Sequence, residues 1–423
     1  MMRLTFLSDS DYLGGGGVAA ATIGRAIADQ LGPFDWIMLR AGSVNEPWHR
    51  HLLPAMTDMP ITWRALARVA GAAWRDAATV RSHQYNHWIR GLLRARLREL
   101  KPDVIQVHSL HVAGWDFEII ACCEEFAPVV YTMHDFWHTT ARCMFPYECT
   151  QFESGCTATC PTADQHPRLH PAAIHSEWLH RRRIVSNSRR LKGVAVSEYI
   201  RRETLRGAWR GADVQVIRNG LNLSQDFRPM SPAEARCKLG IPCDRPVLLI
   251  AALSLEDRRK GFSLLLEALR SIPSKEYTIL AFGNDNVETL SKQSNFHHLG
   301  YLSLESEKRI AYSSADWTVV PSIAETLNMV AVESIACGTP VISFAVGGLP
   351  EVVIPGRSGI LAGLPGASSL AKALSEALQL SPTTSSLRAS CREVAEELFD
   401  SRRTAREYIQ LYQESVSHRS ARA

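Results

Sequence analysis

Long apolar runs are absent from this sequence. No stretch approaches the roughly 18 residues that a membrane-spanning helix needs. Near the N-terminus only Leu4 to Leu7 lie between Arg3 and Ser8-Asp9, which is too short for the apolar core of a signal peptide. Low-complexity segments and short repeats are also lacking. We therefore expect a cytoplasmic protein.

A strong excess of charge is missing as well. The 423 residues carry a net charge of +4, and this modest value does not favour nucleic acid as a partner. A chain of this length exceeds what one hydrophobic core supports, so two domains are expected. Ten cysteines in a cytoplasmic protein should be reduced, metal-bound or buried rather than form a disulfide framework.

Strand-like and helix-like segments alternate along the chain, which predicts an α/β fold of parallel sheets with helices on both faces. In the first half the expected strands are 3–8, 35–39, 104–107 and 129–132, with a loop at 14–17 and a helix at 18–31. After about residue 229 a second series follows at 247–253, 277–282, 296–299, 317–320 and 341–344, and 390–416 reads as a helix. Two doubly wound, Rossmann-like domains would bind a ligand in the cleft between them, at the carboxyl ends of their strands.

Two acidic residues follow the expected strand at 317–320. Glu325 is expected on a strand-to-helix loop and Glu333 about two turns into the helix, roughly 12 Å further along. Between them lie the N–H groups of the helix N-terminus, which bind phosphate well. Carboxylates on both sides of an anion site suit a sugar nucleotide, although two acidic residues on one helix are often plain surface charge.

The residues around this pair carry a resemblance to a known family. The pattern continues through Ala336-Cys337-Gly338-Thr339-Pro340-Val341 and Gly347-Gly348-Leu349-Pro350-Glu351. The stretch 322–353 resembles the donor-site signature of family 4 retaining glycosyltransferases, which have the GT-B fold. The likeness covers nearly the whole chain, from the glycine run at 14–17 to Asn219-Gly220 and beyond. Many family members have Phe-Gly where this chain has Leu327-Asn328.

The resemblance implies that the chain has three parts. Residues 1–228 would form an N-terminal acceptor-side domain with a cysteine-rich loop at 139–166. Residues 229–395 would form the domain that binds the donor nucleotide. Residues 396–423 would be a helix that crosses back to the N-terminal domain. Around His134-Asp135 the sequence is similar to the branch that builds bacterial exopolysaccharides, O-antigens and colanic acid.

Lys260 follows the strand at 247–253 in the run Arg258-Arg259-Lys260-Gly261. A cation here would neutralise the charge that grows on a diphosphate leaving group, and the alternative is a solvated basic turn. Where the family has an Arg some six residues earlier, this chain has Ser254, so Arg258 or Arg259 would replace it. The implied donor-binding roles are sugar hydroxyls for Glu325, ribose for Glu333, and diphosphate for Lys260, Arg259 and the loop amides of Thr326, Leu327 and Asn328.

The glycine run includes Gly15 and Gly16, and it lets a backbone approach a ligand closely. The resemblance implies contact with the donor phosphates or the acceptor. A dinucleotide site is the alternative, but the strand at 35–39 is followed by Arg40 and not by an acidic residue. Asp9-Ser10-Asp11 is similar to a metal-binding motif of another glycosyltransferase fold, and here we interpret it as loop or acceptor-side surface.

Histidines follow two strands of the first half. His134 comes after the strand at 129–132, where the resemblance implies a catalytic contact with the donor sugar. A histidine after a strand is otherwise a packing or capping residue. His108 and Asp135 are expected on the acceptor side, and His111 is a weaker candidate there.

Four cysteines fall within 18 residues, near His138 and His166: Cys143, Cys149, Cys156 and Cys160. Intervals of five, six and three residues depart from tight zinc-knuckle spacing, but four soft ligands in one loop favour a structural zinc ion. A loop of this length also needs an organiser. The alternative is reduced or variably oxidised thiols.

The segment 64–101 contains nine basic and two acidic residues, with Trp63, Trp74 and Trp88 interleaved. Basic aromatic helices suit an anionic membrane surface, where a lipid-linked acceptor would be available. Ordinary surface helices are the alternative.

These residues and the resemblance together predict a retaining glycosyltransferase that moves a sugar from a UDP- or GDP-type donor to a glycan. We expect this glycan to be lipid-linked. No cofactor should be needed for catalysis. Two alternatives stay open, namely a sugar-nucleotide epimerase of the same fold and a non-catalytic nucleotide-sugar-binding scaffold.

Overall fold

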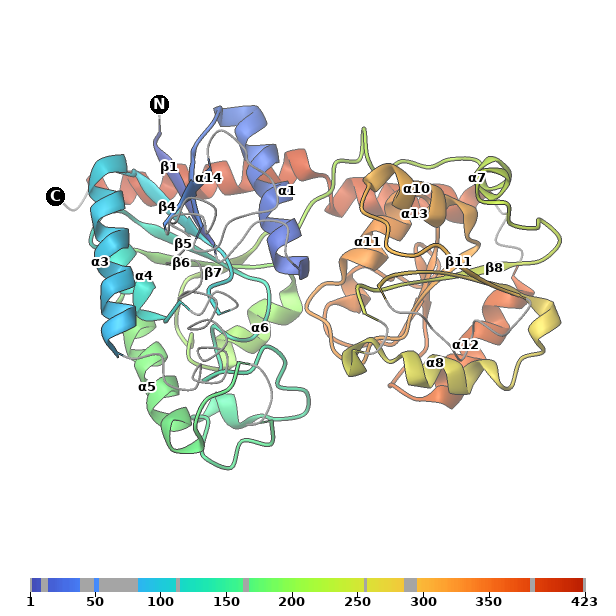
Figure 1. The fold of residues 1–423 in the computed structure, drawn as a ribbon, viewed down its shortest axis with the longest axis horizontal. Coiled ribbons are helices and arrows are strands. Elements are labelled where there is room, and N and C mark those ends of the chain that lie inside the picture. Colours follow the sequence, from blue (N-terminus) through green and yellow to red (C-terminus); the bar gives the residue numbers. More distant parts are fainter. Residues whose placement is uncertain are drawn as a thin grey trace, which may run out of the picture. The chain divides into compact units, whose positions relative to one another are not determined.

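The computed structural model describes residues 2–8, 14–38, 49–52, 83–111, 115–162, 167–254, 257–284, 295–380 and 385–420. The chain divides into two compact α/β units, shown in Figure 1. Unit 1 comprises Met1–Ile217 and Ala405–Ala423, and unit 2 comprises Arg218–Thr404. Asp9-Ser10-Asp11, Arg40, His166 and residues 64–82 of the basic segment lie outside the described residues.

Unit 1 is built on a seven-stranded parallel sheet with the order β3-β2-β1-β4-β5-β6-β7. Phe6 lies opposite Trp36 in one neighbouring strand and opposite Gln106 in the other. The strands are β1 (Leu4–Ser8), β2 (Asp35–Met38), β3 (His49–His51), β4 (Val104–Val107), β5 (Val129–Met133), β6 (Leu191–Ala195) and β7 (Val214–Val216).

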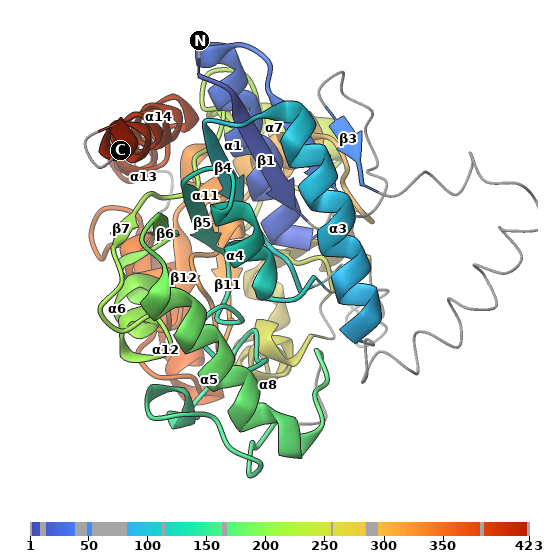
Figure 2. The same cartoon turned by 90° about the vertical axis from the view of Figure 1, so that its left-hand side faces the viewer.

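Helices cover both faces of this sheet because its strands carry apolar side chains on both sides, and these must be buried. Val130 of β5 packs in a core with α1 and α14, whereas the neighbouring Tyr131 contacts Phe117 and Trp209 on the other face. Figure 2 shows α3, α4 and α5 side by side. The helices are α1 (Gly14–Leu31), α3 (His83–Leu100), α4 (Glu118–Glu124), α5 (Pro171–Asn187), α6 (Glu198–Arg206) and α14 (Ser401–Ser420), with a short 3₁₀ helix at Gln151–Glu153.

The C-terminal helix α14 is bound to the sheet of unit 1 by buried tyrosines. The Tyr408 hydroxyl lies 2.8 Å from Thr132 Oγ1, and the Tyr412 hydroxyl donates to Gln106 Oε1 at 3.1 Å. Both tyrosine rings are fully buried, so the end of the chain is part of the core of unit 1. None of the helices in the described ranges is long and apolar enough to cross a membrane.

Unit 2 contains a six-stranded parallel sheet with the order β10-β9-β8-β11-β12-β13. Helices α8 and α12 pack on one face, around Ile250, Ile279 and Trp317. Helices α10, α11 and α13 lie on the other face, as Figure 1 shows. The strands are β8 (Val247–Ala251), β9 (Thr278–Phe282), β10 (Phe296–His298), β11 (Trp317–Val320), β12 (Val341–Ser343) and β13 (Gly359–Leu361). The helices are α7 (Pro232–Leu239), α8 (Phe262–Leu269), α10 (Glu305–Ser314), α11 (Met329–Ala336), α12 (Ala367–Gln379) and α13 (Ser385–Leu398).

The unit boundaries differ from those expected at 228/229 and 395/396. Residues 218–228 belong to unit 2 because Leu221 pairs with the far end of that unit: its N–H donates to the Phe399 carbonyl at 2.8 Å, and its carbonyl accepts from the Ser401 N–H at 3.0 Å. The same pairing interrupts the helix expected over 390–416, which is in fact two helices, α13 and α14.

Candidate functional site

Both sheets have the strand order of a doubly wound fold, in which the order reverses beside the first strand. This reversal lies between β1 and β4 in unit 1 and between β8 and β11 in unit 2. Ligands of such sheets bind outside the carboxyl ends of the strands at this point. His108 follows β4, Lys260 follows β8 and Glu325 follows β11. The topology therefore brings the predicted residues of each unit to its expected binding edge.

In unit 2 the loop after β11 places Glu325 against two donors. Lys260 Nζ lies 2.7 Å from Glu325 Oε1, and Asn328 Nδ2 donates to the same oxygen at 2.9 Å. Glu325 is 6% exposed, so this carboxylate is buried with its hydrogen-bonding partners. A small cavity beside them is lined by Ile250, Ala251, Ala252, Lys260, Phe262, Val320, Pro321, Ser322 and Asn328.

Asn328 has a backbone conformation that few residues adopt. Its φ is +75°, in the region that glycine occupies freely and asparagine tolerates better than most residues. Its side chain also caps α11, because Oδ1 accepts from the Ala331 N–H at 2.9 Å. Leu327 before it is almost fully buried. Asn328 thus adopts a positive φ, caps α11 and donates a hydrogen bond to Glu325.

Gly347 and Gly348 allow their own backbone to pass very close to the backbone of the Glu325 loop. A Cβ at Gly347 would lie 1.9 Å from the Glu325 carbonyl oxygen, and one at Gly348 would lie 2.2 Å from the Thr326 carbonyl oxygen. No side chain fits at either distance. Gly261, after Lys260, approaches the Pro321 carbonyl oxygen in the same way. The glycines of the sequence signature therefore fix the backbone of the loop.

Glu333 lies just over one turn into α11, because the helix begins at Met329. The expected two turns assumed a helix that starts earlier. The Tyr312 hydroxyl of α10 donates to Glu333 Oε2 at 2.8 Å. Burial raises the pKa of Glu333, and the charge of Lys308 and the Tyr312 hydrogen bond act in the opposite direction. Burial, followed by the charge of Glu333, raises the pKa of Tyr312, so this hydroxyl remains a donor at neutral pH.

The basic turn after β8 is ordered by Asp257. Arg259 Nη2 lies 2.5 Å from Asp257 Oδ2, and the Arg259 N–H donates to Oδ1 at 2.9 Å. The Arg259 carbonyl accepts from the Ile323 N–H at 2.8 Å, which joins this turn to the loop after β11. The backbone of Arg259 thus lies next to the Lys260–Glu325 pair, while its guanidinium is bound by Asp257.

In unit 1 two histidines lie in contact. His108 Nδ1 is 3.0 Å from His134 Nε2, and their rings are stacked with centroids 5.3 Å apart. Burial lowers the pKa of His134 to about 4 and that of His108 well below its usual value. Both imidazoles are therefore neutral at pH 7, and one ring donates to the other.

The glycine run forms the first turn of α1, not the expected loop. A Cβ at Gly16 would lie 3.0 Å from Ser109 Oγ and 3.6 Å from His134 Cβ, whereas Gly15 has open space around its Cβ position. Glycine at position 16 therefore lets the start of the helix approach the strand ends that carry the histidines. Each glycine destabilises a helix by about 1 kcal/mol relative to alanine. Burial of the apolar face of α1 in the core offsets this cost.

Asp135 is held beside these histidines. Its Oδ1 accepts from the Trp137 N–H at 2.8 Å, and its Oδ2 lies 3.4 Å from His111 Nε2. Gly16, His108, His134 and Asp135 thus come together at one edge of unit 1.

The zinc site predicted at the four cysteines of the loop stays a prediction for the described residues. No group of three His, Cys, Asp or Glu side chains there is placed to hold a metal. Arg142 occupies the space beside two sulfur atoms, at 3.6 Å from Cys143 Sγ and 3.7 Å from Cys160 Sγ. A cationic guanidinium therefore lies beside these two thiols. His138 is also engaged elsewhere, at 2.8 Å from Thr204 Oγ1.

Side chains of α5 contact several parts of this loop. Arg181 of α5 donates to the carbonyls of Trp137 and Thr140, and its guanidinium carbon lies 3.9 Å from the centre of the Trp137 ring. Trp178 Nε1 donates to the Phe152 carbonyl at 3.0 Å. These contacts hold the loop at Trp137, Thr140 and Phe152.

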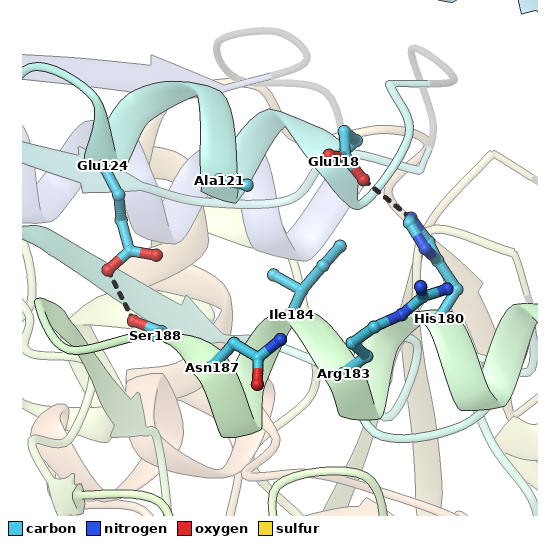
Figure 3. Close-up of a pocket in the computed structure, with 8 residues that line it drawn as sticks. All are labelled: Glu118, Ala121, Glu124, His180, Arg183, Ile184, Asn187 and Ser188. Atoms are coloured by element: carbon cyan, nitrogen blue, oxygen red, sulfur yellow. Dashed lines mark hydrogen bonds and ion pairs between the residues drawn. The ribbon is translucent and has the colours of Figure 1, made fainter.

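A cavity of about 370 Å³ lies between α4 and α5 of unit 1 (Figure 3), and its lining includes none of the predicted site residues. His180 Nε2 and Glu118 Oε2 bridge the two helices at 2.9 Å, and Ser188 Oγ donates to Glu124 Oε1 at 2.5 Å. These contacts tie the helices together, and we assign the cavity no ligand.

In unit 2, sequence reasoning missed the contacts of Asn328 with Glu325 and of Tyr312 with Glu333. The Leu-Asn departure from the family pattern was a usable signal for Asn328. Tyr312 had no signal, because it lies on a different helix from Glu333.

Two family models match the chain. The model described as "Glycosyltransferase Family 4" matches residues 14–225, and that described as "Glycosyl transferases group 1" matches residues 233–397. Among curated proteins, D-inositol 3-phosphate glycosyltransferase of Mycolicibacterium smegmatis is 31% identical over 195 residues, covering 43% of this chain and 44% of that protein. D-inositol 3-phosphate glycosyltransferase 2 of Catenulispora acidiphila is 32% identical over 172 residues, covering 36% of this chain and 40% of that protein. The chain thus matches less than half the length of these relatives.

Solved structures share the fold over nearly the whole chain. Sucrose-phosphate synthase of Thermosynechococcus elongatus has a TM-score of 0.72 at 20% identity and covers 99% of this chain and 100% of its own. HepE of Anabaena, solved in complex with UDP-glucose, has a TM-score of 0.65 at 16% identity with the same coverage. The fold predicted from the sequence, GT-B with two Rossmann-like domains, is confirmed.

Proposed function

Since the chain belongs to glycosyltransferase family 4, we propose that it transfers a sugar from a nucleoside diphosphate donor to a glycan with retention at the anomeric carbon. The observation that carries the proposal is the Lys260–Glu325–Asn328 cluster at the binding edge of unit 2, with Glu333 further along α11. We further propose that the acceptor glycan is lipid-linked, that the product belongs to a bacterial surface polysaccharide, and that the protein is cytoplasmic.

The donor is assigned to unit 2. Within the described part of the chain, both donors to Glu325 bind Oε1, so we assign Oε2 to the sugar hydroxyls. Glu333 receives Tyr312 on Oε2, which leaves Oε1 for the ribose. Lys260 would turn from Glu325 toward the diphosphate when the donor binds, and the amides of 326–328 at the start of α11 would add hydrogen bonds.

Residues of unit 1 complete the proposed chemistry. His134 is neutral at pH 7, so it acts as a hydrogen-bonding group at the sugar and not as a cation. His108 fixes its ring through the 3.0 Å contact. His108 and Asp135 are the acceptor-side groups of the proposal, and Gly16 gives the acceptor or the phosphates access to the backbone of α1.

We assign no covalent nucleophile. Departure of the nucleoside diphosphate and attack of the acceptor would occur on one face of the sugar, and a donor phosphate oxygen would take the acceptor proton. The protein then contributes positioning and fixed charge, which are the main sources of rate in such transfers. Lys260 and the helix amides take the role that a divalent cation has in other transferases.

UDP-glucose is the first donor to test, because HepE was solved with it. A thermal-shift screen of UDP-, GDP-, ADP- and dTDP-sugars should give one donor that stabilises the protein, and that donor is then incubated with lipid-linked glycan or with inositol phosphate, the acceptor in the relatives' names. New glycoside with the α- or β-configuration of the donor supports the proposal. A second sugar isomer formed without acceptor supports the epimerase, and binding without turnover supports the scaffold.

Membrane contact is a weaker part of the proposal, because the described residues of the basic segment are largely ion-paired. In α3, Arg94 pairs with Glu125 at 2.6 Å and Arg96 with Glu99 at 2.8 Å, and Arg90 contacts Asp116. Trp88 is half exposed on the same helix. Sedimentation with anionic and neutral vesicles tests the contact, and equal binding to both would remove it from the proposal.

A further inference from the structure

Two donors share one oxygen of Glu325. Lys260 Nζ lies 2.7 Å from Oε1, and Asn328 Nδ2 donates to the same oxygen at 2.9 Å. The Glu325 side chain is 7% exposed, and Asn328 is also 7% exposed. A buried carboxylate needs hydrogen-bonding partners, because an unsatisfied one is costly. This oxygen therefore has one charged partner and one neutral partner.

The amide of Asn328 is held in one orientation. Its Oδ1 accepts from the Ala331 N–H at 2.9 Å, and a backbone N–H can only donate. The amide oxygen must therefore face the helix, which leaves the NH₂ group toward Glu325. The side chain is short and buried, and the φ of +75° fixes the direction in which it leaves the backbone. Asn328 is thus the fixed member of the two donors.

Lys260 is the donor that is able to move. Its backbone N–H donates to the Asp257 carbonyl at 2.8 Å, which holds the main chain of the turn. Its side chain is 25% exposed, and the four-carbon chain of a lysine is flexible. Rotation about the side-chain bonds therefore carries the ammonium group away from Glu325 while the backbone stays in place.

We propose that Asn328 is a positioning residue that frees Lys260 to bind the donor diphosphate. The inference rests on the proposed function, in which Lys260 turns from Glu325 to the diphosphate. If Lys260 were the only donor to Oε1, that turn would leave a buried carboxylate oxygen without a partner. Asn328 keeps the oxygen hydrogen-bonded after Lys260 has left. The exchange moves one ammonium group between two anions and breaks no covalent bond.

A purely structural role is the alternative, because the same side chain caps α11. Loss of a cap would weaken the helix whether or not the ligand carries a diphosphate. The positioning role acts only on ligands with the diphosphate, and it disappears when residue 325 carries no charge. Asn328→Gly separates the two roles, since glycine accepts the positive φ while the amide is removed.

The test is a double-mutant cycle of wild type, Asn328→Gly, Glu325→Gln and the variant with both changes. Calorimetry measures the affinity for the nucleoside diphosphate of the preferred donor, and competition measures that for the matching nucleoside. Asn328→Gly should bind the diphosphate about tenfold more weakly than wild type and the nucleoside within about twofold of it. In the Glu325→Gln background the same change should alter diphosphate affinity by less than about twofold, because no carboxylate then holds Lys260.

Equal losses in both backgrounds, or an equal loss for the nucleoside, would make Asn328 a capping residue and overturn the proposal. Wild-type affinity for the diphosphate in Asn328→Gly would overturn it as well. In these outcomes the wild type still binds the nucleotide, so the proposed function is untouched. If the wild type binds no nucleoside diphosphate, the proposed function fails and this inference fails with it.

A crystal structure of the wild type with the same nucleoside diphosphate tests the exchange without any variant. We expect Lys260 Nζ at hydrogen-bond distance from a phosphate oxygen and Asn328 Nδ2 still on Glu325 Oε1. Lys260 still paired with Glu325 in the complex, or Asn328 turned to the phosphate, would overturn the proposal. Poor folding of a variant therefore does not spare it.

Discussion

Replacing Tyr312 with Phe removes a single hydroxyl from the candidate nucleotide site. That hydroxyl donates to Glu333 Oε2 at 2.8 Å, and Tyr312 is fully buried, so the phenyl ring of the variant keeps the packing of α10 against α11. The variant therefore perturbs the carboxylate and little else. Glu333 retains its raised pKa from burial and loses the hydrogen bond that opposes it.

The size of the effect follows from this contact. A hydrogen bond to a charged group contributes about 1.5–3 kcal/mol. Because the ionised carboxylate accepts this bond best, the pKa of Glu333 should rise further in Tyr312→Phe. Glu333 has a folded pKa above its ordinary 4.5, so its burial favours the fold at low pH and this contribution is lost as the pH rises through the folded pKa. The destabilisation caused by Tyr312→Phe should accordingly be larger at neutral pH than at acidic pH.

The assay is calorimetric titration of the preferred nucleoside diphosphate between about pH 5 and about pH 8, with wild type, Tyr312→Phe and Glu333→Gln. Ribose hydroxyls donate best to the ionised carboxylate, so wild-type affinity should rise with pH and the midpoint should move to higher pH in Tyr312→Phe. Glu333→Gln should be weak and nearly independent of pH. Superimposable profiles for wild type and Tyr312→Phe would refute the role given to this pair.

Three further predictions test neighbouring features. Asn328→Ala should lower the free energy of unfolding more than Asn328→Gly, because only alanine is strained at the positive φ, by about 1–2 kcal/mol. Denaturant titrations measure both losses. Equal losses would show that only the helix cap and the bond to Glu325 contribute to stability. His134→Ala should lower kcat at least about tenfold while leaving nucleotide affinity nearly unchanged, as measured by steady-state rates and calorimetry, and a normal rate would make His134 a packing residue. Turnover should survive excess EDTA; loss of activity restored by Mg²⁺ or Mn²⁺ would contradict the role of Lys260 and return Asp9-Ser10-Asp11 to consideration.

Sequence patterns placed the strands that precede the candidate site residues, because these strands are short, apolar and buried. The strand at Trp317–Val320 was placed to the residue, and the loop and helix after it followed from the spacing of Glu325 and Glu333. Strand β6 was missed, since Lys192 and Gly193 weaken its apolar pattern. A Cβ at Gly193 would lie 2.6 Å from Met133 Cε and 2.9 Å from Val214 Cγ2, so a larger residue there would force these side chains to move. Tertiary packing, not local preference, makes this segment a strand.

Contacts between distant residues could not be read from the sequence. Tyr312 and Glu333 lie on different helices, and the break between α13 and α14 depends on Leu221 pairing with residues near 400. The cysteine spacing likewise does not show that Arg142 lies beside two of the sulfur atoms. Each of these features depends on which side chains meet in the fold.

The central claim is that unit 2 binds a sugar nucleotide with Glu333 at the ribose and Glu325 at the sugar. The most direct measurement is calorimetry of one nucleoside diphosphate and of its sugar-bearing form with wild type, Glu333→Ala and Glu325→Ala. Glu333→Ala should lose roughly 1–3 kcal/mol, about tenfold or more in affinity, for both ligands. Glu325→Ala should bind the bare nucleotide as wild type does and weaken only for the sugar-bearing donor. Unchanged affinity in Glu333→Ala, or equal loss for both ligands in Glu325→Ala, would contradict the account.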